Sequence, residues 1–392
     1  MQIPQAFKPS LKIMRILIAP DTLKGSLSAV DAANCIEAGL HAALSTVECI
    51  KIPMSDGGEG FLATIAQVFP YMQQKTKTVT GPRGKPILAR YGFIAREETA
   101  VIEWAQGAGL HGLPATEQDA LTAQSTGIGE LMRHAEAQGA TRFIIGLGGS
   151  ATCDGGIGAL SQLGFHFLNK TGKTIEPNAR GLLELDQIVE DKHSSFKRYP
   201  EITVLYDVNS PLTGHRGAIL YAKQKGATSR ECAQIKQAFT HYGHVLDNYT
   251  QQAIQHIPGT GAAGGAGAGF HALLNAKLMS GAEWILNKLD MANIIKTVDC
   301  VIVSEGSLDA QSLSGKAPIK IATLAKKEAK PVIALVGKNT LGPEQLNATG
   351  ITAVFSLTNG PMSKKTALTR GQLEMQHLSE QLGRLLNAFS KQ

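Results

Sequence analysis

The sequence predicts an α/β protein of two domains, and three observations support this. Short apolar runs alternate with helical patterns along the chain, which is typical of parallel strands joined by helices. The length of 392 residues is enough to bury two separate cores. Glycine contributes 42 residues, against an average usage of roughly 7%, and these glycines cluster where strands give way to helices.

The first strand is predicted over 15–19, an apolar run that ends at Pro20. A helix should follow, because Ser28 and Asp31 have the spacing of a capping box. Apolar residues at helical spacing then continue to Leu40.

The rest of the chain continues the alternation. Later strands are predicted over 142–145, 202–206, 300–303, 331–336 and 353–357. Helices are predicted over 127–138, 155–163, 229–255, 267–278, 316–329 and 369–389. Residues 76–104 differ, because a Gly-Pro-Arg-Gly turn between alternating runs indicates a β-hairpin in a mixed sheet. Prolines and glycines near 53–60 and 258–281 indicate where the chain is expected to pass from one domain to the other.

Composition excludes several classes of protein. The apolar fraction of 43% rules out a disordered chain. A net charge of +6 without a basic run argues against nucleic-acid binding and suits a small anionic ligand. No apolar run is long enough to span a membrane, and the start of the chain lacks the pattern of a signal peptide. The five cysteines are widely spaced, so we expect reduced thiols in a cytoplasmic protein.

The strongest motif is the glycine-rich segment 146–156, which follows an apolar strand and precedes a helix. Glycines allow close backbone approach, so several amides can point at one anion, and the helix N-terminus adds partial positive charge. Ser150 and Thr152 could add hydroxyl donors. The segment therefore predicts a phosphate site, with a tight strand–helix turn as the alternative.

Two further glycine clusters occur. Residues 259–269 could form another ligand loop or a small-residue helix packed closely on a neighbour. Residues 54–60 place Asp56 and Glu59 among glycines, which suits a metal-bound phosphate, substrate hydroxyls, or an Asp-Gly turn with an N-cap.

Polar residues also follow other predicted strands, where α/β proteins bind ligands. Lys24 lies in the loop after the first strand, and could meet a carboxylate or phosphate. Asp207, Glu305 and Asp309 come just past later strands, which makes them candidates for a general base or for magnesium ligands. Helix capping is the alternative for each of them.

Several common motifs are absent. There is no P-loop, protein-kinase or nucleophile-elbow pattern. The spacing Gly146-x-Gly148-x-x-Ala151 fits a dinucleotide fingerprint, but 163–173 offers no acidic residue for the ribose. A Rossmann oxidoreductase therefore remains only an alternative.

From Met14 onward, the chain resembles the bacterial glycerate kinase type-1 family. The matching segments, in order, are 18–21 with 24–26, 53–60, 148–156, 207–208 with 211–214, 224–227, 261–267, and 305–306 with Asp309, 315–316 and Pro318. The resemblance implies ATP-dependent phosphorylation of D-glycerate to a phosphoglycerate, with the 2-phosphate favoured, and Mg²⁺ as cofactor. It also implies a flavodoxin-like domain built from 14–60 and 276–392, with an inserted mixed-sheet domain over 61–275. A homodimer is left open.

The resemblance and the residues together suggest roles. The predicted catalytic residues are Asp207, which would accept the proton of the glycerate hydroxyl, Asp56 as second choice, and Lys24. The residues predicted to hold ATP are Gly148, Gly149, Ser150, Thr152, Gly155, Gly156, Lys225 and Lys316. Those predicted to bind glycerate are Asp21, Lys24, Ser26, Asp56 and Glu59. Magnesium would be held by carboxylates among Asp154, Glu305 and Asp309.

The chain departs from the family pattern in its presumed functional loops. Ser307 stands where an arginine is usual, Cys153 where asparagine is usual, and Tyr206 replaces a small residue. Ser304 is a further departure, where glycine is usual. A kinase of another small hydroxy acid and a nucleotide-binding regulator without catalysis are therefore alternatives.

Overall fold

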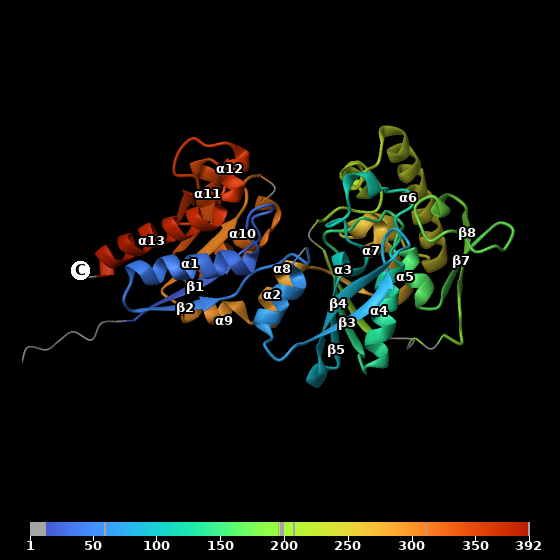
Figure 1. Cartoon of the computed structure of the whole chain (residues 1–392), viewed down its shortest axis with the longest axis horizontal. Helices are drawn as coiled ribbons and strands as arrows, with labels where there is room; N and C mark the ends of the chain where they lie inside the picture. The colour runs from blue at the N-terminus through green and yellow to red at the C-terminus, as the bar shows by residue number, and fades with distance from the viewer. Residues whose placement is uncertain are drawn as a thin grey trace, which may run out of the picture. The chain divides into compact units, whose positions relative to one another are not determined.

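The computed structural model describes residues 13–58, 60–194, 196, 200–206, 208–310 and 312–390. Backbone contacts divide the chain into two compact units (Figure 1). The terminal unit contains both chain ends, up to Ser55 and from Ile285, and the inserted unit runs from Asp56 to Trp284. The sequence placed the crossings near 60 and 275. The second crossing comes later because residues 277–280 still form a strand of the inserted unit.

The terminal unit is built on a five-stranded parallel sheet in the order β13-β12-β11-β1-β2. Its strands are β1 (Met14–Pro20), β2 (Val47–Lys51), β11 (Cys300–Glu305), β12 (Val332–Val336) and β13 (Ala353–Ser356). Counted along the chain, this order is 2-1-3-4-5, which is the flavodoxin-like arrangement. The predicted α/β class and parallel sheet are confirmed.

Helices cover this sheet. They are α1 (Ala29–Ala43), α9 (Met291–Lys296), α10 (Ala317–Lys327), α11 (Pro343–Thr349), α12 (Lys364–Thr369) and α13 (Gly371–Ser390), with α8 (Gly281–Lys288) crossing the unit boundary. Ile16 and Ile18, alternate residues of β1, are fully buried in one apolar cluster with residues of α1 and α13. These two helices lie side by side in Figure 1. Gly39 allows the approach, since a Cβ there would lie 2.4 Å from the carbonyl oxygen of Gln376.

The inserted unit contains a six-stranded mixed sheet in the order β10-β9-β6-β5-β4-β3. Its strands are β3 (Gln73–Thr80), β4 (Pro86–Ile94), β5 (Thr99–Glu103), β6 (Arg142–Gly146), β9 (Glu201–Tyr206) and β10 (Lys277–Ser280). The β3–β4 pair is antiparallel, which confirms the predicted hairpin. A separate antiparallel pair joins β7 (Phe165–Asn169) to β8 (Leu185–Glu190).

The helices of the inserted unit are α2 (Phe61–Val68), α3 (Trp104–Ala108), α4 (Thr126–Ala137), α5 (Ile157–Gln162), α6 (Ser229–Thr250) and α7 (Ala262–Leu274). Helices α3 to α7 share one apolar core with the sheet. Two predicted helix ranges were wrong at their ends. The helix predicted over 229–255 stops at Thr250 because Gln251 is left-handed, and the one predicted over 267–278 stops before Asn275, also left-handed. The first turn of α7 is kinked, because Ala263, Gly264 and Gly265 are not helical.

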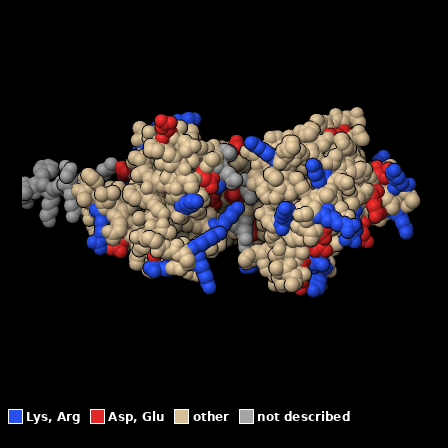
Figure 2. Space-filling view, turned by 90° about the horizontal axis from the view of Figure 1, so that it is seen from above, with Lys and Arg blue, Asp and Glu red and all other residues tan. Residues whose placement is uncertain are grey.

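On the face seen in Figure 2, the described residues form no large patch of positive or of negative charge alone. There the described Lys and Arg side chains are interspersed with Asp and Glu. Among the described residues, no helix has both the length and the apolar character needed to cross a membrane.

Candidate active site

The three glycine clusters predicted from the sequence meet in the inserted unit, at the carboxyl ends of β6 and β9. The Gly148 amide donates a 2.9 Å hydrogen bond to the carbonyl of Gly57. A Cβ at Gly148 would lie 2.2 Å from the Cα of Gly58, so no larger residue fits without moving one segment. The 54–60 cluster is therefore packed directly against the loop after β6.

The third cluster, at the start of α7, packs against the same loop. The Gly155 amide donates to the Gly264 carbonyl at 3.0 Å. A Cβ at Gly264 would lie 2.0 Å from the carbonyl oxygen of Thr152. Ala263 and Gly264 have φ of 50° and 64°, so the backbone makes a left-handed turn where it touches the loop. Ala263 is a non-glycine residue in this region, and such strain concentrates at functional sites.

Most amides of the loop after β6 are used by the protein itself. Hydrogen bonds to other protein atoms are made by the amides of Leu147, Gly148, Ala151, Thr152, Gly155 and Gly156. Among the described residues, the amides of Gly149 and Ser150 donate to no protein acceptor, and Gly149 is exposed. The Gly149 and Ser150 amides are thus available to bind an anion directly. Thr152, Gly155 and Gly156 are buried and shape the loop.

Asp154 is buried at the centre of this loop. Its Oδ2 accepts from the Ser125 amide at 2.8 Å and the Ser125 hydroxyl at 2.6 Å, and Oδ1 accepts from the Gly156 amide at 3.1 Å. The Gly158 amide adds a fourth donor at 3.3 Å. Burial raises the pKa of Asp154, against the opposing effect of these hydrogen bonds. The carboxylate joins the starts of α4 and α5, and its oxygens face protein donors.

Lys225, a predicted ATP-binding residue, lies against the same loop. The side chain is only 5% exposed, and Nζ donates a 2.7 Å hydrogen bond to the Thr152 carbonyl. An ammonium has three donors, so one protein acceptor leaves capacity for an anion or water. The neighbouring Cys153 is fully enclosed, and burial raises the pKa of its thiol.

Other predicted residues lie in the terminal unit, in the loop after β1. The Asp21 amide donates to the Ser304 carbonyl at 2.8 Å, which ties this loop to the end of β11. Lys24 is exposed. Ser26 is engaged, because its hydroxyl donates to the Leu368 carbonyl at 2.8 Å.

At the end of β11, two acidic side chains are linked through hydrogen bonds to one serine. Glu305 is 3% exposed, and its Oε2 accepts from the Ser312 hydroxyl at 3.0 Å and the Lys316 ammonium at 3.3 Å. The Ser312 amide also donates to Asp309 Oδ1 at 3.4 Å. Burial raises the pKa of Glu305, and Lys316 opposes this rise. The structure thus brings Glu305, Asp309 and Lys316 together.

Two oxygens in this part of the sheet lack partners. Glu305 Oε1 and Ser304 Oγ are buried and have no hydrogen-bond partner within the described part of the chain. A buried acceptor without a donor is costly. These atoms therefore suit a cation or a ligand hydroxyl.

The remaining predicted residues fall differently. Asp56 begins the inserted unit, and its Oδ1 accepts from the Gly58 amide at 3.1 Å, which is the Asp-Gly turn given as the alternative. Asp207 and Glu59 lie outside the described residues. The predicted metal set is divided, since Asp154 belongs to the inserted unit and the other two carboxylates to the terminal unit.

Sequence reasoning missed three residues that support these sites: Ser125, Ser312 and Tyr242. The fully buried Tyr242 donates its hydroxyl to the Gly155 carbonyl at 3.1 Å. Ser312 had a usable signal, because it lies three residues after Asp309 and follows the pattern of a local polar turn. Ser125 and Tyr242 are distant in sequence from the loop they hold.

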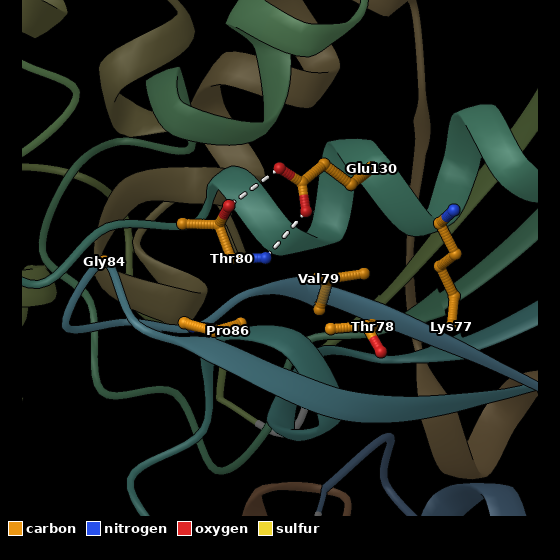
Figure 3. A pocket seen from close by; sticks show the side chains of 7 residues that line it. All are labelled: Lys77, Thr78, Val79, Thr80, Gly84, Pro86 and Glu130. Atoms are coloured by element: carbon orange, nitrogen blue, oxygen red, sulfur yellow. Dashed lines mark hydrogen bonds between the residues drawn. The ribbon is translucent and has the colours of Figure 1, made fainter.

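A surface hollow elsewhere in the inserted unit contains none of the predicted residues (Figure 3). It lies between the β3–β4 hairpin and α4. Glu130 accepts from both the amide and the hydroxyl of Thr80, at 2.7 and 2.8 Å. This carboxylate anchors the hairpin to the helix.

Comparison with known proteins identifies the family. The model of the glycerate kinase family matches residues 16–387. The chain belongs to the glycerate kinase family. It is 38% identical to a glycerate 2-kinase of Escherichia coli over 88% of this chain and 90% of that one, and 37% identical to a glycerate kinase of Halalkalibacterium halodurans over 91% and 94%. A crystal structure assigned as glycerate kinase 2 from Salmonella typhimurium LT2 superposes with a TM-score of 0.81 at 35% identity, over 97% of this chain and all of that one.

The family membership gives the departures a structural setting. The Ser307 hydroxyl, at the position where the family usually has arginine, donates to Asp309 Oδ2 at 3.1 Å. Tyr206 lies against the backbone of Gly259, where a Cβ would be 2.4 Å from the ring. Both substitutions are thus accommodated by contacts inside their own unit.

Proposed function

We propose that this kinase transfers the γ-phosphoryl group of ATP to D-glycerate, with the 2-phosphate as product. Relatives that are named glycerate kinases support the substrate, and one named glycerate 2-kinase supports the position. The reaction needs positioned anion binding more than covalent chemistry.

The observation that carries the proposal is that two glycine segments pack against a third, the loop after β6. Their mutual contacts fix a backbone that leaves the Gly149 and Ser150 amides open, with the buried Lys225 ammonium behind it. Backbone amides and a lysine that are already fixed in place can stabilise the charge of a phosphate group, because these donors do not have to reorganise first. We assign the ATP phosphates to this loop, with Gly148, Thr152, Gly155 and Gly156 acting by setting its shape.

The carboxylates at the end of β11 fit a magnesium ion better than Asp154 does. Among the described residues, none donates to the buried Glu305 Oε1, and Asp309 is linked to the same carboxylate through Ser312. Asp154 has its oxygens occupied by four donors. We therefore keep Glu305 and Asp309 as the magnesium ligands and give Asp154 a structural role. Bound Mg²⁺ would neutralise phosphate charge.

Glycerate would be held by the loop after β1. The exposed Lys24 ammonium is suited to the carboxylate, with Asp21 near the sheet edge to accept a hydroxyl. Ser26 shapes this loop through Leu368. Asp207 remains our choice for the base, with Asp56 second.

The test is ADP release by the purified chain with ATP, Mg²⁺ and a panel of hydroxy acids, with the product identified by ³¹P NMR. Turnover of D-glycerate to the 2-phosphate is expected. Turnover of a different acid alone would make the chain a kinase of that acid. Nucleotide binding without turnover would indicate a regulator, and NAD reduction without ADP an oxidoreductase.

The base is tested separately. Asp207→Asn should lower kcat far more than it raises KM, because the proton acceptor is lost while substrate contacts remain. Near-normal turnover by this variant would contradict the assignment.

A further inference from the structure

Three side chains of different chemistry converge on the outer part of the terminal unit. Glu37 and His41 lie four residues apart on α1, so they share one face of the helix. Cys49 lies on β2, the edge strand of the parallel sheet. One ligand atom from each residue lies within 4.8 Å of the other two.

This cluster is separate from the residues assigned to phosphoryl transfer. Cys49 pairs in register with Ile16, near the start of β1, whereas the predicted ligand loops follow the carboxyl end of the strand at Pro20. Four residues of strand correspond to roughly 13 Å at about 3.3 Å per residue. The cluster therefore needs an explanation other than catalysis.

Its donor set is that of a transition-metal site. A thiol, an imidazole and a carboxylate are the ligands that proteins use for Zn²⁺, most often in a tetrahedral arrangement. His41 is exposed, and Glu37 and Cys49 are half-buried, so an ion can reach all three from solvent. Within the described part of the chain, the His41 imidazole makes no hydrogen bond or ion pair, so both ring nitrogens are available.

Lys51 provides the competing interaction. Its Nζ lies 2.5 Å from Glu37 Oε2 and 3.0 Å from Asn34 Oδ1. Lys51 projects from the same face of β2 as Cys49, two residues further on, so its ammonium competes with a metal ion for the Glu37 carboxylate. The carboxylate keeps a second oxygen, and Lys51 keeps Asn34 as an acceptor if the pair opens.

We propose that Glu37, His41 and Cys49 bind one Zn²⁺ ion, with water as the fourth ligand. The ion would join the last turns of α1 to the edge strand β2. Since a ligand that binds only the folded state stabilises it, zinc would raise the melting temperature of the terminal unit. This site is independent of the proposed glycerate kinase activity.

The experiment uses Co²⁺ as a spectroscopic substitute for zinc on the full-length, reduced protein. A thiolate-to-cobalt absorption band should grow to saturation at one Co²⁺ per chain and disappear when Zn²⁺ is added. Cys49→Ser should abolish the band, and His41→Ala should weaken binding by about tenfold or more. Circular dichroism of each variant checks that it is folded.

Two matched variants make the test specific. Cys232→Ser removes another half-buried thiol, in the inserted unit, and should leave the band unchanged. Lys51→Met removes the competing ammonium and should tighten binding. No band in the unaltered protein, a band that survives Cys49→Ser, or a Lys51→Met variant that binds no more tightly would each overturn the three-ligand site.

Discussion

Replacing Gly148 by alanine tests whether the glycines serve close backbone packing. The new Cβ would lie 2.2 Å from the Cα of Gly58 and 3.2 Å from the carbonyl oxygen of Gly57. Carbon atoms in contact are normally about 3.5–4.0 Å apart, so the two segments must separate by more than about 1 Å. That movement also strains the 2.9 Å hydrogen bond between Gly148 and Gly57.

The two effects set the magnitude. Overpacking costs about 1–3 kcal/mol, and a lost hydrogen bond adds about 1 kcal/mol. We expect the free energy of unfolding of the inserted unit to fall by about 2–4 kcal/mol. At about 2–4 °C per kcal/mol, the Tm should drop by about 5–15 °C.

Calorimetry measures the shift, and ADP release measures activity at a temperature where the variant stays folded. Activity should fall as well, because the open amides of Gly149 and Ser150 move with the loop. Gly360→Ala is the matched control, since a Cβ there meets nothing within 4 Å. A Gly148→Ala variant with the same Tm as the unaltered protein would refute the packing argument.

Three further predictions concern stability. Ala329 occupies the left-handed position (φ 51°) after α10, in a Schellman-type cap, so Ala329→Gly should stabilise the terminal unit by about 1 kcal/mol; an unchanged Tm contradicts this. Tyr242→Phe removes the bond to Gly155 and should destabilise the inserted unit by about 1 kcal/mol in urea unfolding, with no effect if that bond contributes nothing. Thr228→Ala removes the hydroxyl that accepts from the Glu231 amide, the side-chain half of the capping box of α6, and should cost about 1 kcal/mol at pH 7. Hydrogen bonds from the Thr228 backbone amide and hydroxyl lower the pKa of Glu231. The stabilisation from the hydroxyl is therefore present above the usual glutamate pKa and is lost as the pH falls through the lowered value. Urea unfolding should show a smaller difference in stability between the variant and the unaltered protein at pH 3 than at pH 7.

Local features of the fold were predictable because their signals are contiguous. The strand, glycine loop and helix around 142–162 appear in order in the sequence and again as β6, loop and α5. The group of Glu305, Asp309 and Lys316 was also predictable, because the three residues lie within one short segment after β11. Edge strand β2 was not predicted; it is short and only partly buried, with Glu48 exposed.

The function of individual loop residues was less accessible. The sequence indicates that a glycine lets the backbone approach another segment closely, but it does not indicate which segment that is. At Gly148 the neighbour is Gly58, ninety residues earlier in the chain, and at Gly264 it is Thr152. Asp154 resembles a metal ligand by its local sequence, yet its main partner, Ser125, is 29 residues away. Such pairings are set by tertiary packing, which no local pattern encodes.

The position of β1 has a consequence for how the protein is made. Its neighbour β11 is supplied by the other end of the chain, and the Arg15 amide bonds to Asp299 across a separation of 284 residues. At about 5–20 residues per second, a ribosome needs roughly 15–60 s to synthesise that interval. During this time one edge of β1 is unpaired, while the inserted unit emerges as one continuous segment. The newly made amino-terminal strand is therefore the part of this chain most in need of protection by a chaperone.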